Sequence, residues 1–133
     1  GVQTCALPIY AAARRANTDK AAASYEAFLS RVAAPLFRDA AQVLKAEGQL
    51  FTLHTPAGSV RLASDHASQD FLELDLDSSG AEPQVIGRVS CFRGGKGVVV
   101  EERPLAPGKA IDALTEEDVS QFLLAEITKL VTR

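Results

Sequence analysis

Residues 72–77 read Leu-Glu-Leu-Asp-Leu-Asp, and this stretch decides the fold class. Leucine alternates strictly with an acidic residue, and this period of two is typical of a strand with one buried face. The leucines therefore indicate a face turned toward a core. Glu73, Asp75 and Asp77 indicate a face turned toward solvent. Such a strand needs neighbouring strands and a covering layer to bury its leucines.

The period of two recurs on both sides of this stretch. Apolar and polar residues alternate from Phe51 to His54 and again from Val60 to Ala63, with a turn at 56–58 between them. Two more strands are expected at 85–92 and 98–103. The connection between them, Arg93 to Gly97, is rich in glycine. We interpret it as a hairpin turn and not a phosphate loop, because a strand and not a helix is expected to follow it.

Helical spacing appears at both ends of the chain. From Asp19 onward, steps of three and four residues separate the apolar positions Tyr25, Phe28, Leu29, Val32, Leu36, Ala40, Val43 and Leu44. Asn17 or Thr18 is expected to cap this helix, Pro35 to kink or split it, and Gly48 to end it. A second helix is expected to open at Thr115 with Asp118 in a capping-box position. Its apolar face would be Val119, Phe122, Leu123, Ile127, Leu130 and Val131.

These elements predict an α+β fold. An N-terminal helix precedes a five-stranded antiparallel meander and a C-terminal helix. Each helix has one apolar stripe, so we expect both helices on one face of the sheet. Strand parity assigns to the open face Thr52, His54, Arg61, Phe71, Glu73, Asp75, Ile86, Arg88, Ser90, Phe92, Val99, Glu101 and Arg103.

The first nine residues, 1–9, correspond to the translation of a common short-read sequencing adapter, so we expect them not to be native. The native chain would then enter at about Tyr10 or Ala11. Residues 10–24 form an Ala-rich lead-in, and 25–133 form a single α+β domain. This trimming leaves Cys91 as the one native cysteine, which favours a reducing cytoplasm. Whether a signal peptide precedes the break stays open.

Composition narrows the function classes. A net charge of −3 gives no general attraction to nucleic acid. No apolar run approaches the roughly 20 residues of a membrane span. His54 and His66 lack the spacing of a zinc site, and the parity of Cys91 favours a buried apolar role. We therefore expect no catalytic residue, no cofactor and no metal, and binding in place of enzymatic activity.

An interface is the positive expectation. Phe71, Ile86, Phe92 and Val99 would be apolar residues on an otherwise polar sheet face, with Arg88 between them. Apolar residues gathered on a polar face are typical of a contact with another protein. We expect a non-enzymatic binding or adaptor domain that contacts a protein partner or itself, as a homodimer.

The order of elements resembles that of the frataxin-like fold and, more coarsely, bacterial secretion chaperones. Frataxins have an acidic iron-binding first helix and a tryptophan on the sheet. This chain has no tryptophan, and its first helix has few acids beyond Glu26, Asp39 and Glu47. The alternative function is thus a frataxin-like metal-handling protein that uses Glu73, Asp75 and Asp77 on one strand face. A plain structural role would instead pair Glu73 with Arg88 across the hairpin.

Overall fold

The computed structural model describes residues 19–56, 58–67, 69–79 and 82–131. The expected α+β fold is confirmed. One antiparallel sheet has the order β1-β2-β3-β4-β5. The strands are β1 (Phe51–His54), β2 (Ser59–Ser64), β3 (Phe71–Asp77), β4 (Gln84–Phe92) and β5 (Val98–Pro104). Residues 1–9 and the expected caps Asn17 and Thr18 lie outside the described residues.

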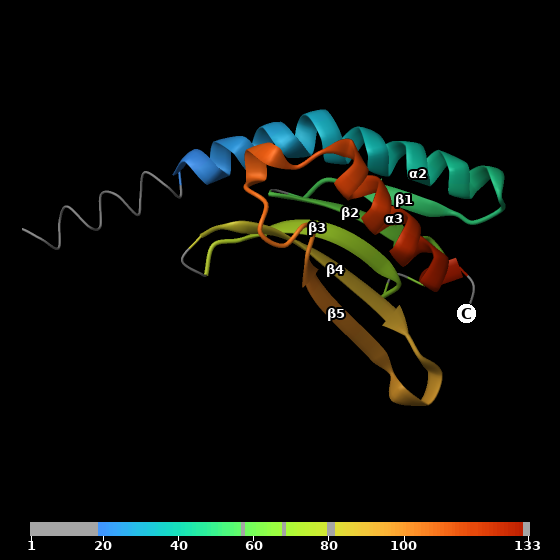
Figure 1. The fold of residues 1–133 in the computed structure, drawn as a ribbon. Helices are drawn as coiled ribbons and strands as arrows, with labels where there is room; N and C mark the ends of the chain where they lie inside the picture. The colour runs from blue at the N-terminus through green and yellow to red at the C-terminus, as the bar shows by residue number, and fades with distance from the viewer. Residues whose placement is uncertain (1–18, 57, 68, 80–81, 132–133) are drawn as a thin grey trace, which may run out of the picture.

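The helices form a single layer on one side of the sheet (Figure 1). Residues 19–28 are helical and continue into the π-helical segment η1 (Leu29–Ala33) and then into α2 (Ala34–Ala46). The C-terminal helix is α3 (Glu116–Val131). Between this layer and the sheet lies the core, whose fully buried large apolar side chains are Phe37, Val60, Leu62, Leu72, Leu74, Val119 and Phe122.

Pro35 changes the hydrogen bonding of the first helix and does not end it. Proline has no N–H and its ring crowds the preceding turn. The turn before it widens, so that the Ala34 N–H donates to the Leu29 carbonyl, and Pro35 falls in the first turn of α2. The helix ends as expected at Gly48, which has a φ of 82°. Gly48 donates to the Lys45 carbonyl and Gln49 to the Leu44 carbonyl at 2.8 Å, which is a Schellman motif.

The start of α3 is a reciprocal capping box, as the sequence predicted. The Thr115 N–H donates to Asp118 Oδ2 at 2.9 Å, and the Asp118 N–H donates to Thr115 Oγ1 at 3.4 Å. Farther along α3, Phe122 lies against the backbone of Gly87 in β4. A Cβ built on Gly87 would stand 2.3 Å from Phe122 Cε1, so only glycine permits this close approach.

The predicted strand faces are confirmed for β1 to β4 and wrong for β5. Leu72 pairs with Val89, and Glu73 pairs with Arg88, as expected. In β5, Val99 pairs with the core residue Cys91, which places Val99, Glu101 and Arg103 on the helix side. The β5 side chains on the open face are instead Val98, Val100 and Glu102, because each pairs with an open-face residue of β4.

Candidate interface on the open sheet face

A row of alternating charges crosses the open face. Arg61, Glu73, Arg88 and Glu102 stand directly opposite one another on β2, β3, β4 and β5. Arg61 Nε lies 2.9 Å from Glu73 Oε2, and Arg88 Nη1 donates to Glu73 Oε1. Arg88 Nε lies 3.2 Å from Glu102 Oε1. Every member of the row, which we call the charged row, is therefore neutralised by its neighbours.

Glu73 is the centre of this row. Glu73 is only 4% exposed although its side chain faces away from the helices, because two arginines cover it. Both of its carboxylate oxygens receive a charge-assisted hydrogen bond, the stronger kind of such bonds. The hydrogen bond to Glu73 raises the pKa of Arg88 above its ordinary value. The guanidinium of Arg61 also lies 4.2 Å from the centre of the Phe71 ring.

The three acids of the alternative metal-binding hypothesis each have other partners. Glu73 binds the two arginines, and Asp75 Oδ1 accepts the N–H of Leu76 at 2.8 Å. Asp77 Oδ1 accepts hydrogen bonds from the hydroxyl and the N–H of Ser79, which lower the pKa of Asp77. Among the described residues, no group of three or more His, Cys, Asp and Glu side chains could hold a metal ion. The alternative thus gains no support from the described geometry.

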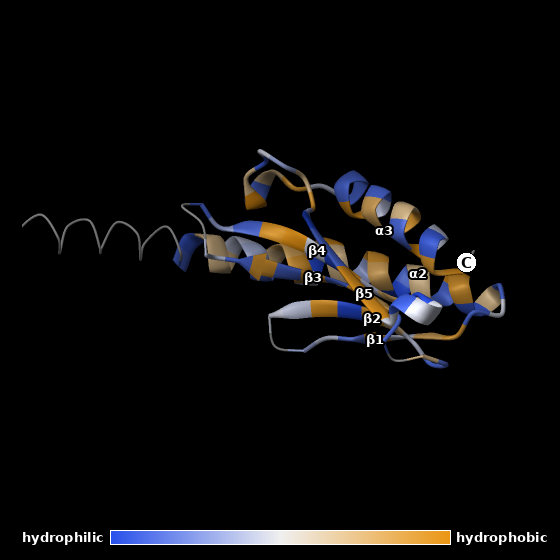
Figure 2. Ribbon diagram, turned by 90° about the horizontal axis from the view of Figure 1, so that it is seen from below, coloured by the Kyte–Doolittle hydropathy of each residue, from blue (hydrophilic) through white to orange (hydrophobic). Residues whose placement is uncertain are grey.

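Beside the charged row lies an exposed apolar surface at the β4–β5 turn. Phe92, Val98 and Val100 are 43%, 50% and 51% exposed, and we call these three residues the hairpin patch. Phe92 stands directly opposite Val98, and Val100 is the next residue along the same face of β5. Figure 2, which views the molecule from below, shows hydrophobic colour on β5 leading to the pale glycine-rich turn.

The expected interface residues are only partly brought together. Phe71 pairs with Ser90 and so lies diagonally beside Phe92, but it is half-buried under Arg61. Ile86 stands six residues from Phe92 along β4, about 20 Å away. Arg88 belongs to the charged row, and Val99 is on the other face. Phe92 alone joins the hairpin patch, and Val98 and Val100 take the place assigned to Val99.

An ion pair with a buried carboxylate, on the helix side of the sheet, was not predicted from the sequence. Arg103 Nη2 lies 3.1 Å from Glu126 Oε1, and Glu126 is 2% exposed. Lys129 Nζ lies 3.5 Å from the second oxygen, Oε2. A signal was present, because Glu126 follows Phe122 by four residues and precedes Leu130 by four, within the apolar stripe of α3. A cavity of about 360 Å³ lies beside this pair, over Gly87 and Val89.

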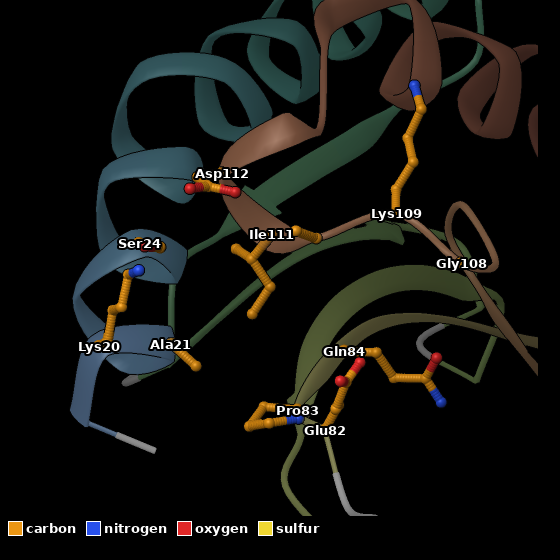
Figure 3. Close-up of a pocket in the computed structure, with 11 residues that line it drawn as sticks. Lys20, Ala21, Ser24, Glu82, Pro83, Gln84, Gly108, Lys109, Ile111 and Asp112 are labelled. Carbon is orange, nitrogen blue, oxygen red and sulfur yellow. The ribbon is translucent and has the colours of Figure 1, made fainter. Parts of the chain in front are cut away.

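A second cavity, of about 480 Å³, opens at the other end of the sheet (Figure 3). Lys20 and Ser24 of the first helix line one side, and Glu82, just before β4, and Gln84, its first residue, line another. In Figure 3 the Lys109 side chain extends away from Lys20, and its Nζ lies 2.8 Å from Asp118 Oδ2. The charged groups around this cavity therefore do not converge on one point.

Comparison with known proteins gave no match. The chain matches no protein-family model, no curated protein and no solved structure at a significant level. Within the described residues, no helix has the length and apolar character needed to cross a bilayer.

Proposed function

We propose that this domain is a non-enzymatic binding module that associates with a second copy of itself through the open face of its sheet. The hairpin patch is the observation that carries the proposal. Three large apolar side chains stand together on the surface, whereas scattered single ones would need no explanation. Removing such a cluster from water is favourable by about 25 cal/mol per Å² of apolar area.

The surroundings of the patch support a protein partner. The charged row beside it is internally paired, so approaching protein would not have to desolvate an unpaired charge there. Interfaces commonly have this arrangement of an apolar centre with polar residues at the rim. The β4–β5 hairpin also extends away from the helix layer, so neither helix obstructs access to the patch (Figure 1).

Sedimentation of matched variants tests the proposal. Phe92→Glu places a carboxylate in the hairpin patch of both copies at once, where unpaired charge is costly. We expect the wild-type protein to dimerise as its concentration rises and the Phe92→Glu protein to sediment as a folded monomer. Leu124→Glu is the control, because Leu124 is 71% exposed on α3, away from the sheet.

A wild type that remains monomeric at every concentration would contradict the proposal. So would a Leu124→Glu protein that dissociates as readily as Phe92→Glu, because the loss would then follow from added charge alone. Circular dichroism and a melting curve of each variant establish that folding is retained.

A further inference from the structure

The free edge of the sheet lies beside the hairpin patch. β5 is the last strand in the order and has no neighbour on its outer side within the described residues. An edge strand presents N–H and C=O groups that another strand can pair with, and folds usually protect such edges with charge, proline or a covering segment. Here the first three residues of the edge are Val98, Val99 and Val100.

The ladder between β4 and β5 shows which backbone groups face outward. The Arg93 N–H donates to the Gly97 carbonyl at one end, and the Leu105 N–H donates to the Val85 carbonyl at the other. Hydrogen-bonded and non-hydrogen-bonded pairs alternate in an antiparallel ladder. The hydrogen bonds at both ends therefore indicate that the odd-numbered residues of β5 bond to β4. The backbone groups of Val98, Val100 and Glu102 point to the free edge.

The same residues of β5 thus present both exposed side chains and outward-facing backbone groups. Val98 and Val100 expose their side chains on the open face and their N–H and C=O groups at the edge. Pro104, which follows Glu102 in this parity, has no N–H to offer, so the pairing surface ends there. This combination is the one used when a strand is added to an exposed sheet edge.

We infer that the added strand is β5 of a second copy, paired antiparallel about a two-fold axis at Val100, so that the two sheets become one continuous sheet. This inference rests on the proposed self-association and specifies its geometry. Val100 would pair with Val100 of the second copy, and Val98 with Glu102 at each side. Each of these pairs exchanges both of its hydrogen bonds, because none of the three residues is proline.

Neighbouring registers are less favourable. An axis at Glu101 or at Glu102 sets that acid directly opposite its own copy, and like charges directly opposite are destabilising. It also brings Pro104 into the ladder, where one donor is lost. An axis at Val99 would need the turn residue Lys96 as a strand residue, whereas Lys96 ends the 3-10 segment η2 (Gly94–Lys96).

Charge supports the register at Val100. Lys96, at the tip of the hairpin, would lie diagonally across from Glu102 of the second copy, within reach of a long side chain. The same contact recurs on the other side of the axis. Val98 and Val100 of both copies would form a single apolar cluster on the open face, with Phe92 at each end.

Val100→Pro is the decisive variant. The N–H that it removes points to the free edge and takes no part in the pairing with β4, and proline is tolerated on an edge strand at such a position. We expect Val100→Pro to give a folded monomer. Val100→Thr retains the N–H and the branched shape, so we expect it still to dimerise. A folded Val100→Pro protein that dimerises like the wild type would overturn edge pairing, yet leave face-mediated self-association intact if Phe92→Glu is monomeric.

Amide hydrogen exchange of the wild type gives a test that needs no variant. The amides of Val98, Val100 and Glu102 should gain protection as protein concentration rises. Those of Val99 and Glu101 should be protected at all concentrations, because they bond to β4. Protection at Val98, Val100 and Glu102 that does not change while the protein dimerises would overturn the inference, even if Val100→Pro fails to fold. A wild type that never dimerises would overturn both proposals.

Discussion

Leu74 and Asp75 show how much a single position in β3 decides. Leu74 is completely buried beneath the helices, whereas Asp75 is on the open face and partly exposed. Leu74→Ala should reduce the free energy of unfolding by about 2–5 kcal/mol, because it removes buried methyl groups and leaves a cavity. Asp75→Ala should change it by no more than about 0.5 kcal/mol, the usual limit for surface positions. Urea denaturation measures both, and equal losses would mean that the strand faces are misassigned.

The close packing at Gly87 leads to a second prediction about stability. Its added Cβ would meet the ring of Phe122, which is only 1% exposed and packed in the core. Gly87→Ala should therefore lower stability by at least the 1–3 kcal/mol typical of an overpacked core. Gly95→Ala is the matched control, since no atom lies within 4 Å of the Cβ built there.

The double variant Gly87→Ala, Phe122→Leu separates the steric cause from others. A smaller side chain at residue 122 makes space for the new methyl group, so the two changes should cost less than their sum. Additive losses in thermal denaturation would show that the clash is not the reason for glycine at this position.

At the scale of the element, the start of α3 makes a prediction about pH. Hydrogen bonds from Lys109 and from the Thr115 backbone hold the pKa of Asp118 below its ordinary value of 3.8. The pKa of Asp118 is lower in the folded than in the unfolded state. The stabilisation of the fold by the ionised carboxylate is therefore fully present above about pH 3.8. That stabilisation is lost as the pH falls through the lowered value.

Asp118→Asn should therefore be less stable than the wild type at neutral pH, by up to about 1 kcal/mol as for charges at helix ends. The difference should shrink as the solution is acidified below the pKa of the carboxyl. Asp112→Asn, at an exposed acid just before the helix, serves as the control. A difference that stays constant between neutral and strongly acidic solution would argue against an ionised Asp118 in the capping box.

Elements with a clear period were predictable, and β5 shows where the signal ends. The leucines of β3 alternate with acids, so both the strand and its faces followed from the sequence. Residues 98–103 are three valines followed by three charged residues, which contain no alternation. The two faces of β5 depend on the turn at 93–97, because a shift of one residue in the pairing register moves every β5 side chain to the opposite face of the sheet.

At the scale of the whole molecule, the contacts that the sequence did not predict join distant segments. Glu126 was identifiable as a charge within an apolar stripe, but its partner Arg103 is 23 residues away on another element. The charged row was predictable only at the pair Glu73 and Arg88, because the alternation of β3 set their register. Arg61 and Glu102 joined the row through the registers of β2 and β5, which depend on their turns.

The meander order of the sheet has a consequence for how the chain reaches this structure. Every strand pairs with the strand that precedes or follows it, across the connections 55–58, 65–70, 78–83 and 93–97. Closing such short loops costs little entropy, so the sheet can grow by successive hairpins. The contact between α2 and α3 spans most of the described chain and should form late. A sheet built from neighbouring hairpins should fold on the order of milliseconds, with docking of the C-terminal helix as the step that completes the core.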